Sequence, residues 1–211
     1  MSDGTPESLT FAGLSIAFDD RVLRPRAWTE AQARWAAALL SELPGGPVLE
    51  LCSGAGHIGL AAVAGTGRRL VCVDMNPVAV EYNRANARSA GLDSLVEVRQ
   101  GRIGEALGPD ELFPLVIADP PWVLSAETPR FPEDPRTAID GGIDGLRVAL
   151  ECAGAIEGHL AGGGAALLQL GSVDQVAALM SKVSESLRVL ETRQFDGGVV
   201  AHLVRDSAPV Q

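Results

Sequence analysis

The 211-residue sequence contains no apolar run long enough to span a bilayer, so a membrane-embedded protein is not expected. Its first ten residues, MSDGTPESLT, have neither a basic region nor an apolar core, which argues against a secretion signal. Because these residues are polar and include Gly and Pro, we expect a flexible tail over 1–8, and a second tail over 206–211.

Cysteine is scarce. The chain has Cys52, Cys72 and Cys152, an odd number, and no C-x-x-C spacing. A zinc site is therefore not predicted, and no other metal site is indicated. We interpret Cys72 as a small apolar residue of a strand and Cys152 as one of a helix. Unpaired cysteines fit a reducing, cytoplasmic setting.

Runs of Lys or Arg are also missing, and the formal net charge is −10. Nucleic-acid-binding proteins carry basic patches that neutralise phosphates. An overall negative field repels a phosphate backbone, so DNA and RNA are unlikely partners. The oligomeric state is not predicted by these features.

The composition is that of one globular domain, with 46% hydrophobic and 21% charged residues and no internal repeat. Residues 9–46 are predicted to form two short strands around Ala12-Gly13, followed by a helix that starts near Glu30 with Thr29 as its cap. The apolar face of this helix recurs at i, i+3, i+4 and i+7 and comprises Ala33, Ala36, Ala37 and Leu40.

Residues 47–205 then alternate strands with helices, which is typical of a doubly wound α/β sheet. Helices are expected from about Ile58, from Asn76-Pro77 to Gly91, over 145–160 and over 173–187. The strands are PVLELC, RRLVCVD, LVEVRQ, PLVIAD and GAALLQLG, followed by the closing pair RVLETRQF and GVVAHLVRD. We predict seven strands in the order 3-2-1-4-5-7-6, with helices on both faces and only the seventh strand antiparallel.

The turn after the first of these strands contains Gly54-x-Gly56-x-x-Gly59, the spacing found in dinucleotide-binding proteins. Asp74 ends the second strand, where an acidic residue binds ribose hydroxyls. Both features serve NAD and S-adenosylmethionine (SAM) equally well. Glu50 favours SAM, because a carboxylate beside the turn can hold its ammonium group, directly or through water, and would repel a pyrophosphate.

The segment ADPPW at the carboxyl end of the fourth strand lies where open α/β sheets bind their ligands. The Asp119 side chain and the Pro120 carbonyl can accept hydrogen bonds from a planar amide or amino nitrogen. Pro120 and Pro121 make the loop rigid, and Trp122 can stack on a flat group. We therefore predict Asp119, Pro120, Pro121 and Trp122 as the catalytic residues, with no separate general base.

Together, ELCSGAG, VDMNP and DPPW resemble the motifs of class I SAM-dependent methyltransferases. VLRPRAWTE and PRTAIDGGIDGL are similar to the HemK/PrmC family, which methylates a glutamine amide of peptide release factors. The resemblance covers roughly residues 9–205 and implies a Rossmann-like methyltransferase fold with SAM as cofactor and S-adenosyl-L-homocysteine as product. The implied cofactor-binding residues are Thr29, Glu50, Leu51, Cys52, Ser53, Gly54, Gly56, Asp74, Met75, Arg102, Ile103 and Asp119.

The chain departs from that family at several places. It has Asp119 where the family has Asn, Arg102 where an acidic residue is usual, and Cys52 where Gly stands. An ionised Asp only accepts hydrogen bonds, whereas Asn also donates. We also expect no counterpart of the N-terminal helical domain that helps bacterial members to bind the release factor. A protein glutamine is the preferred acceptor, and N- or O-methylation of a small molecule is the alternative.

Two other classes stay open at this stage, an NAD-binding oxidoreductase and a non-catalytic SAM-binding module. Several further residues have structural interpretations. Trp28 and Trp35 are expected to pack, Tyr82 to lie in the core or an interface, and His159 and His202 to be structural or solvated. His57 and Arg26 are placed either near the cofactor or in plain structural roles. Turn, cap or solvated positions are expected for Asp140, Asp144, Glu151 and Glu157.

Overall fold

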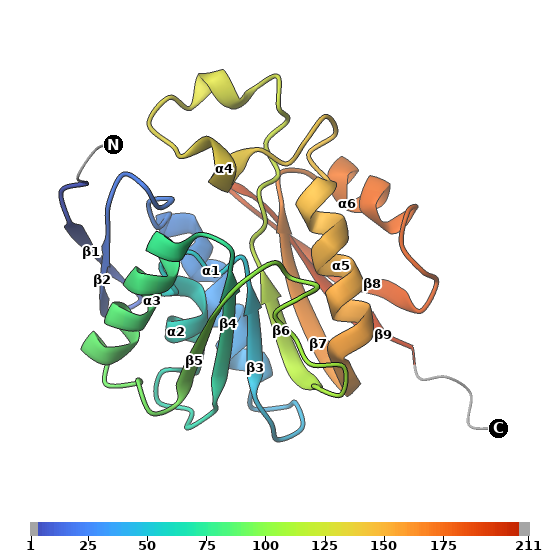
Figure 1. Ribbon diagram of the computed structural model, residues 1–211. Coiled ribbons are helices and arrows are strands. Elements are labelled where there is room, and N and C mark those ends of the chain that lie inside the picture. The colour runs from blue at the N-terminus through green and yellow to red at the C-terminus, as the bar shows by residue number, and fades with distance from the viewer. Residues whose placement is uncertain (1–3, 207–211) are drawn as a thin grey trace.

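The computed structural model describes residues 4–206 as one mixed sheet with helices on both faces and a hairpin beside it (Figure 1). Within these residues, seven strands form the sheet in the order β5-β4-β3-β6-β7-β9-β8. The strands are β3 (Val48–Leu51), β4 (Leu70–Asp74), β5 (Val96–Gln100), β6 (Phe113–Ala118), β7 (Leu160–Leu170), β8 (Leu187–Phe195) and β9 (Gly198–Arg205).

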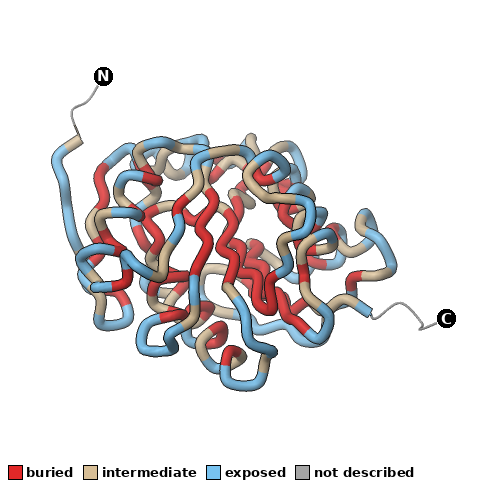
Figure 2. Tube along the Cα trace, turned by 60° about the horizontal axis from the view of Figure 1, so that its bottom comes forward, coloured by how far each residue is buried: buried red, intermediate tan, exposed pale blue. Residues whose placement is uncertain are grey.

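This order is the predicted one. The first five sheet strands pair in parallel, and β9 runs antiparallel to both of its neighbours, β7 and β8. The central strands β3 and β6 are buried along their whole length because helices cover both faces (Figure 2). The apolar sequence of β6, and of β3 apart from Glu50, fits this two-sided burial.

Five helices cover the sheet: α1 (Glu30–Leu39), α2 (His57–Val63), α3 (Pro77–Ser89), α5 (Arg147–His159) and α6 (Val173–Met180). Residues of α1, α2 and α3 share one apolar cluster, and residues of α5 and α6 share another. Alternate strand residues enter the two clusters, because successive strand side chains point to opposite faces. The helix start predicted at Asn76 is confirmed, since its side chain accepts from the Val78 amide at 3.0 Å.

The N-terminal hairpin consists of β1 (Glu7–Phe11) and β2 (Leu14–Phe18), joined at Ala12-Gly13 as predicted. Its first strand begins at Glu7, so the last two residues of the expected tail over 1–8 are part of a strand. Residues 1–3 and 207–211 lie outside the described residues, and the tails predicted there stay predictions. None of the described helices is long and apolar enough to cross a membrane.

Two local predictions are wrong. Thr29 closes a 3-10 turn, Ala27–Thr29, with helical backbone angles, so its hydroxyl donates back to the Arg26 carbonyl at 2.8 Å and does not cap α1. Helix α6 ends at Met180, well before the predicted 187. The Ser184 hydroxyl accepts from the Ser186 amide at 3.2 Å, and such serine contacts compete with helical hydrogen bonds.

The third glycine of the Gly-rich motif has a packing reason. Glu50 is 2% exposed, and its carboxylate accepts from the Gly59 amide at 2.9 Å, which satisfies a donor in the first turn of α2. A Cβ on Gly59 would come within 2.4 Å of the Glu50 carboxylate. Glycine is therefore required here by the buried carboxylate beneath the helix.

We predict that Gly59→Ala lowers the free energy of unfolding by about 1–3 kcal/mol, the range for overpacking a filled core. Gly154→Ala is the matched control, because Gly154 is an exposed helical glycine of α5 whose added Cβ would meet nothing within 4 Å. The control is expected to raise stability by up to about 1 kcal/mol. Urea denaturation of both variants measures the two changes, and equal effects would contradict the role given to Glu50.

Candidate active site

The carboxyl ends of β3, β4 and β6 meet at one edge of the sheet, below a long loop that follows β6. Figure 1 shows this loop, which carries the short helix α4 (Arg136–Ile139), lying over the strand ends. The loop is pinned at its base, where Val123 donates to the Ile139 carbonyl at 2.9 Å and Gly141 donates to the Val123 carbonyl at 2.8 Å. The predicted site residues approach one another below it.

The Gly-rich turn after β3 is held in a left-handed conformation at three positions. Cys52, Gly54 and Gly56 have φ values of 56°, 51° and 83°. A Cβ on Gly56 would come within 2.5 Å of Asn83, whereas a Cβ on Gly54 would meet nothing within 4 Å. The turn is thus packed from behind by helix α3 and faces open space at Gly54, as a cofactor cradle requires.

Asp74 lies beside this open space. Its carboxylate accepts from the Gly54 amide at 2.7 Å and from the Asn76 amide at 2.8 Å, which joins the Gly-rich turn to the end of β4. Burial raises its pKa, although both amides favour the ionised form. The neighbouring Met75 is 65% exposed, so it can cover a flat ring bound at this edge.

Glu50 is almost fully buried next to the Gly-rich turn. Its carboxylate lies beneath the turn, bonded to Gly59, and the Cys72 thiol lies 3.4 Å from its second oxygen. Burial raises the pKa of Glu50 to about 8. The side chain therefore supports the turn, and its predicted contact with an ammonium group, direct or through water, stays a prediction.

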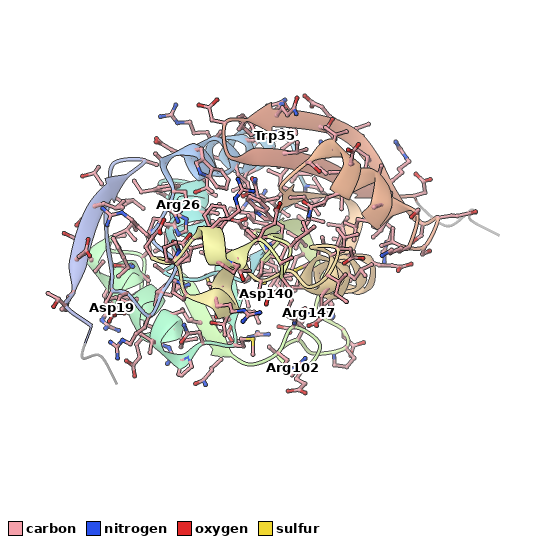
Figure 3. The ribbon with its side chains drawn as sticks, turned by 90° about the horizontal axis from the view of Figure 1, so that it is seen from above. Asp19, Arg26, Trp35, Arg102, Asp140 and Arg147 are labelled. Atoms are coloured by element: carbon pink, nitrogen blue, oxygen red, sulfur yellow. The ribbon has the colours of Figure 1, made fainter. Side chains whose placement is uncertain are left out.

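The other residues predicted to bind the cofactor differ in how far they are exposed. Thr29, Leu51 and Ser53 are at most 2% exposed, so they can act only through their backbone or their neighbours. Ile103 is buried in the core below its loop, while the side chain of Arg102 is 61% exposed, 4.0 Å from Glu151. Figure 3 shows Arg102 at the opposite margin of this edge from Trp35.

Asp119 follows the last residue of β6 and forms the floor of a pocket of about 330 Å³, which we call the acceptor pocket. It is half-buried, and burial raises its pKa to about 7. No hydrogen-bond donor or cation among residues 4–206 contacts its carboxylate. The pocket walls include Trp28, Pro120, Pro121, Trp122, Val123, Phe131 and Ile139.

Two glycines, Gly171 and Gly145, leave the room that Trp122 occupies. A Cβ on Gly171, just after β7, would come within 2.5 Å of its indole ring, and one on Gly145 would meet its carbonyl at 2.4 Å. Gln175 of α6 donates to the Trp122 carbonyl at 2.9 Å and accepts from the Gly171 amide at 2.9 Å. The tryptophan of the Asp-Pro-Pro-Trp segment is thereby fixed in one orientation.

Arg26 is one of the residues that line the acceptor pocket. It donates to both carboxylate oxygens of Asp134 at 2.5 Å and so joins the segment before α1 to the loop after β6. Trp28 packs against Gly197 and also lines this pocket, so its expected packing role is compatible with a place in the site. Trp35 does pack, being 5% exposed.

Three amide side chains that support the site were missed by the sequence analysis. Gln32 of α1 donates to the Ala118 carbonyl, directly before Asp119, at 3.1 Å. Asn86 of α3 joins the Gly-rich turn to β2, because its amide donates to the Ala55 and Ala17 carbonyls at 2.9 Å. Asn83 donates to the Ser53 hydroxyl at 3.1 Å. Polar residues on the inner face of an otherwise amphipathic helix are the signal that could have identified them.

The structural interpretations of other polar residues mostly hold. His57 starts α2 and packs edge-on against Phe11, and burial lowers its pKa to about 4. Tyr82 donates to Asp19 at 2.9 Å. Asp140 and Asp144 accept from amides in their own turns.

The remaining interpretations concern two histidines and two glutamates of the C-terminal half. His159, His202 and Glu151 are structural or solvated as expected. Glu157 was expected on a solvated helix face, but it is half-buried and accepts from the Ser186 hydroxyl.

The cysteines are free, as predicted, with Cys72 buried in β4 and Cys152 buried in α5. The Cys52 and Cys152 sulfurs lie 4.0 Å apart. Within residues 4–206, no three His, Cys, Asp or Glu side chains are grouped so that they could hold a metal ion.

Comparison with known proteins identifies the family. A family model described as "Methyltransferase domain" matches residues 43–190, more than half of the chain. Among solved structures, the catalytic domain of hMettl16 superposes with a TM-score of 0.71 at 16% identity, over 94% of this chain and 77% of that one. The ribosomal protein L11 methylase of Lactobacillus delbrueckii subsp. bulgaricus gives 0.64 at 12%, over 90% and 84%. At such identities these two similarities concern the fold.

Similarity in sequence is greater to glutamine methyltransferases. The release factor glutamine methyltransferase of Rhodopirellula baltica is 26% identical over 94% of this chain and 67% of its own length. The ribosomal protein uL3 glutamine methyltransferase of Bradyrhizobium diazoefficiens is 30% identical over 75% and 54%. The chain spans between 43% and 67% of the length of such relatives. The chain therefore belongs to the methyltransferase-domain family and is a class I methyltransferase that resembles HemK/PrmC.

Proposed function

We propose that this enzyme uses SAM to methylate the side-chain amide nitrogen of a glutamine in a protein. The observation that carries the proposal is that Asp119, the first residue of Asp119-Pro120-Pro121-Trp122, leaves β6 level with the Gly-rich turn and with Asp74 and lines a pocket. The names of the relatives support a glutamine acceptor. The reversed strand β9 argues against a dinucleotide-binding oxidoreductase, whose sheet is mostly parallel.

The residues present fit SAM. The turn offers open space at Gly54, the Asp74 carboxylate can accept from ribose hydroxyls, and Met75 is free to cover the adenine. The carboxyl groups of Asp74 and Asp119 give the site a negative character that suits a cationic ligand. When bound, SAM supplies a methyl group activated by a positively charged sulfur.

The protein's own contribution is orientation. A glutamine amide nitrogen is a weak nucleophile because its lone pair is delocalised into the carbonyl group. The Asp119 carboxyl and the Pro120 carbonyl can accept its N–H groups and direct the lone pair outward, while Trp122 restrains the plane of the amide. The proton can leave after transfer, so a separate base is not needed. In its protonated form, Asp119 could also donate to the amide oxygen, as Asn would.

The direct test is methylation of defined acceptors with radiolabelled SAM. A purified bacterial release factor and ribosomal protein uL3 are the first choices, followed by cell extract. We expect label in protein that yields N-methylglutamine on complete enzymatic digestion. Label recovered in a small molecule, a methyl ester or a C-methyl group would overturn the proposed acceptor.

Asp74→Ala should weaken SAM binding at least about tenfold, since loss of one charge-assisted hydrogen bond costs about 1.5–3 kcal/mol. Titration calorimetry with SAM measures the change. Glu105→Ala is the control, because it removes an exposed carboxyl from the neighbouring loop. An Asp74 variant that is folded and keeps wild-type affinity would remove this residue from the cofactor site.

Asp119→Ala should lower turnover by about a hundredfold or more, the range seen when an orienting polar group is lost. SAM affinity should change much less, because most proposed cofactor contacts lie on the turn after β3 and at the end of β4. Asp119→Asn should retain at least about a tenth of wild-type turnover, since it keeps an acceptor oxygen. Single-turnover methylation, paired with SAM binding, separates the two effects, and wild-type turnover in Asp119→Ala would contradict the assignment.

Asp119 should also make stability depend on pH. Its pKa is about 7 in the folded protein and about 3.9 in an unfolded chain, so the folded state holds an extra proton between these values. The free energy of unfolding should therefore fall as pH rises from 4 to 7. Urea denaturation across this range should show a shallower decline in Asp119→Asn, with a remainder from Glu50 that extends to about pH 8. Equal slopes in both proteins would show that Asp119 titrates normally.

A further inference from the structure

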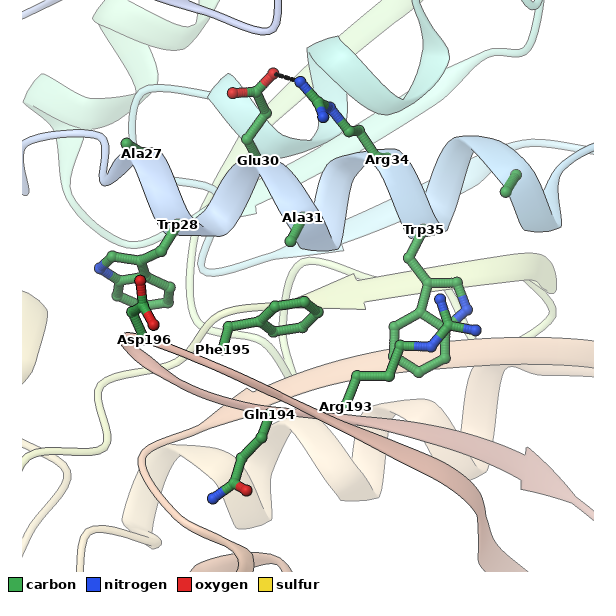
Figure 4. A pocket seen from close by; sticks show the side chains of 11 residues that line it. Ala27, Trp28, Glu30, Ala31, Arg34, Trp35, Arg193, Gln194, Phe195 and Asp196 are labelled. Carbon is green, nitrogen blue, oxygen red and sulfur yellow. Dashed lines mark hydrogen bonds and ion pairs between the residues drawn. The ribbon is translucent and has the colours of Figure 1, made fainter.

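A second cavity, of about 660 Å³, lies between α1 and the β8–β9 hairpin, and we call it the α1–β8 groove (Figure 4). Its size is within the range of about 300–1,000 Å³ typical of ligand pockets. The residues that define it here are Trp28, Ala31, Trp35, Arg193, Phe195 and Asp196. None of them has a part in the chemistry proposed for Asp119.

The walls of the groove alternate large and small side chains. Trp28 of the 3-10 turn and Ala31 and Trp35 of α1 lie along one side of the groove. Phe195 and Arg193 project toward them from β8 (Figure 4). The Arg193 guanidinium lies 3.8 Å from the centre of the Trp35 ring, which is a cation–π contact. Apolar surface is thus exposed in a trough that runs along the helix.

The groove adjoins the acceptor pocket. Trp28 lines both cavities, and the consecutive residues Asp196 and Gly197 line one each. A Cβ on Gly197 would come within 2.2 Å of the Trp28 indole, so this ring rests directly on the β8–β9 turn. Trp28 is therefore the shared wall between the place where a side chain would be methylated and the trough outside it.

The charges of the groove do not suit a phosphate. Arg34 at its rim donates to Glu30 at 2.6 Å, and Arg193 donates to Glu191 at 2.7 Å. Asp196 adds a negative group, and the whole chain carries −10. Neutralised cations beside aromatic rings fit a polypeptide with apolar side chains better than a nucleic acid.

We propose that the α1–β8 groove binds the extended polypeptide segment on one side of the acceptor glutamine. This inference rests on the proposed function, because it assumes a glutamine side chain in the acceptor pocket. The segment would leave the pocket past Trp28 and lay apolar side chains against Phe195 and the α1 face. On another side of the pocket, the Arg26–Asp134 pair holds the loop after β6 in place.

The test uses the protein acceptor that the wild-type enzyme methylates, release factor or uL3. Ala31→Arg fills the groove with a good helix former, and Phe195→Ala removes an aromatic wall. Thr192→Ala is the control, because Thr192 is an exposed β8 residue that does not line the groove. We expect both groove variants to raise KM for the acceptor about tenfold, as loss of one anchoring contact would. Turnover at saturation and SAM affinity should stay within about twofold of wild type, as in the control.

The outcomes are separable. If the wild-type enzyme methylates no protein glutamine, the proposed function fails, and this inference fails with it. If it does so and both folded groove variants keep the wild-type KM, only the inference is overturned. Sedimentation of the wild-type and Ala31→Arg proteins supplies a further check, because a dimer that the substitution dissociates would show that a second copy occupies the groove.

Discussion

The parallel pairing of β3 with both β4 and β6 is the constraint on which the rest of the site depends. Leu51 is in register with Val73 on one side and with Ala118 on the other. The next residue of each strand, Cys52, Asp74 and Asp119, therefore emerges at the same level. Because neighbouring strands lie about 4.8 Å apart, the Gly-rich turn and the carboxyl groups of Asp74 and Asp119 come close together without any long-range adjustment. A shift of one residue in either pairing would separate them.

Burial sets the electrostatics of this edge. Glu50, Asp74 and Asp119 all have raised pKa values, with burial as the first cause in each. Neither Asp74 nor Asp119 has a cationic partner among residues 4–206. A site of this kind is least favourable when its carboxyls are ionised and uncompensated, and a cationic ligand relieves that cost. The same property makes Asp119 compatible with the proposed amide acceptor, since its raised pKa of about 7 leaves the carboxyl partly protonated at neutral pH.

Buried polar side chains hold the backbone around the candidate site by hydrogen bonds. Glu50 holds the first turn of α2, Asn86 joins the Gly-rich turn to the hairpin, and Gln32 holds the carbonyl that precedes Asp119. Cys52 adopts a left-handed φ of 56° at the position where the HemK/PrmC family has glycine. A conformation of that kind costs a non-glycine residue of the order of 1 kcal/mol, and the bonded neighbours of the turn hold it in place.

The sequence by itself determined the architecture and the placement of the candidate site residues at strand ends. The apolar strand runs, the Asn76 cap and the closing strand pair were enough for the sheet order, because two-sided burial and short connections permit few topologies. The positions of Asp74 and Asp119 followed from their places at strand ends. Tertiary structure alone decided which side chains face the cavities. Glu50 turned inward because α2 needed a partner for the Gly59 amide, and Thr29 turned back because the residues before it form a 3-10 turn. Trp28 lines both the acceptor pocket and the α1–β8 groove, because Gly197, which is distant in sequence, leaves room for its ring. Such contacts join residues far apart in the chain, so local periodicity carries no record of them.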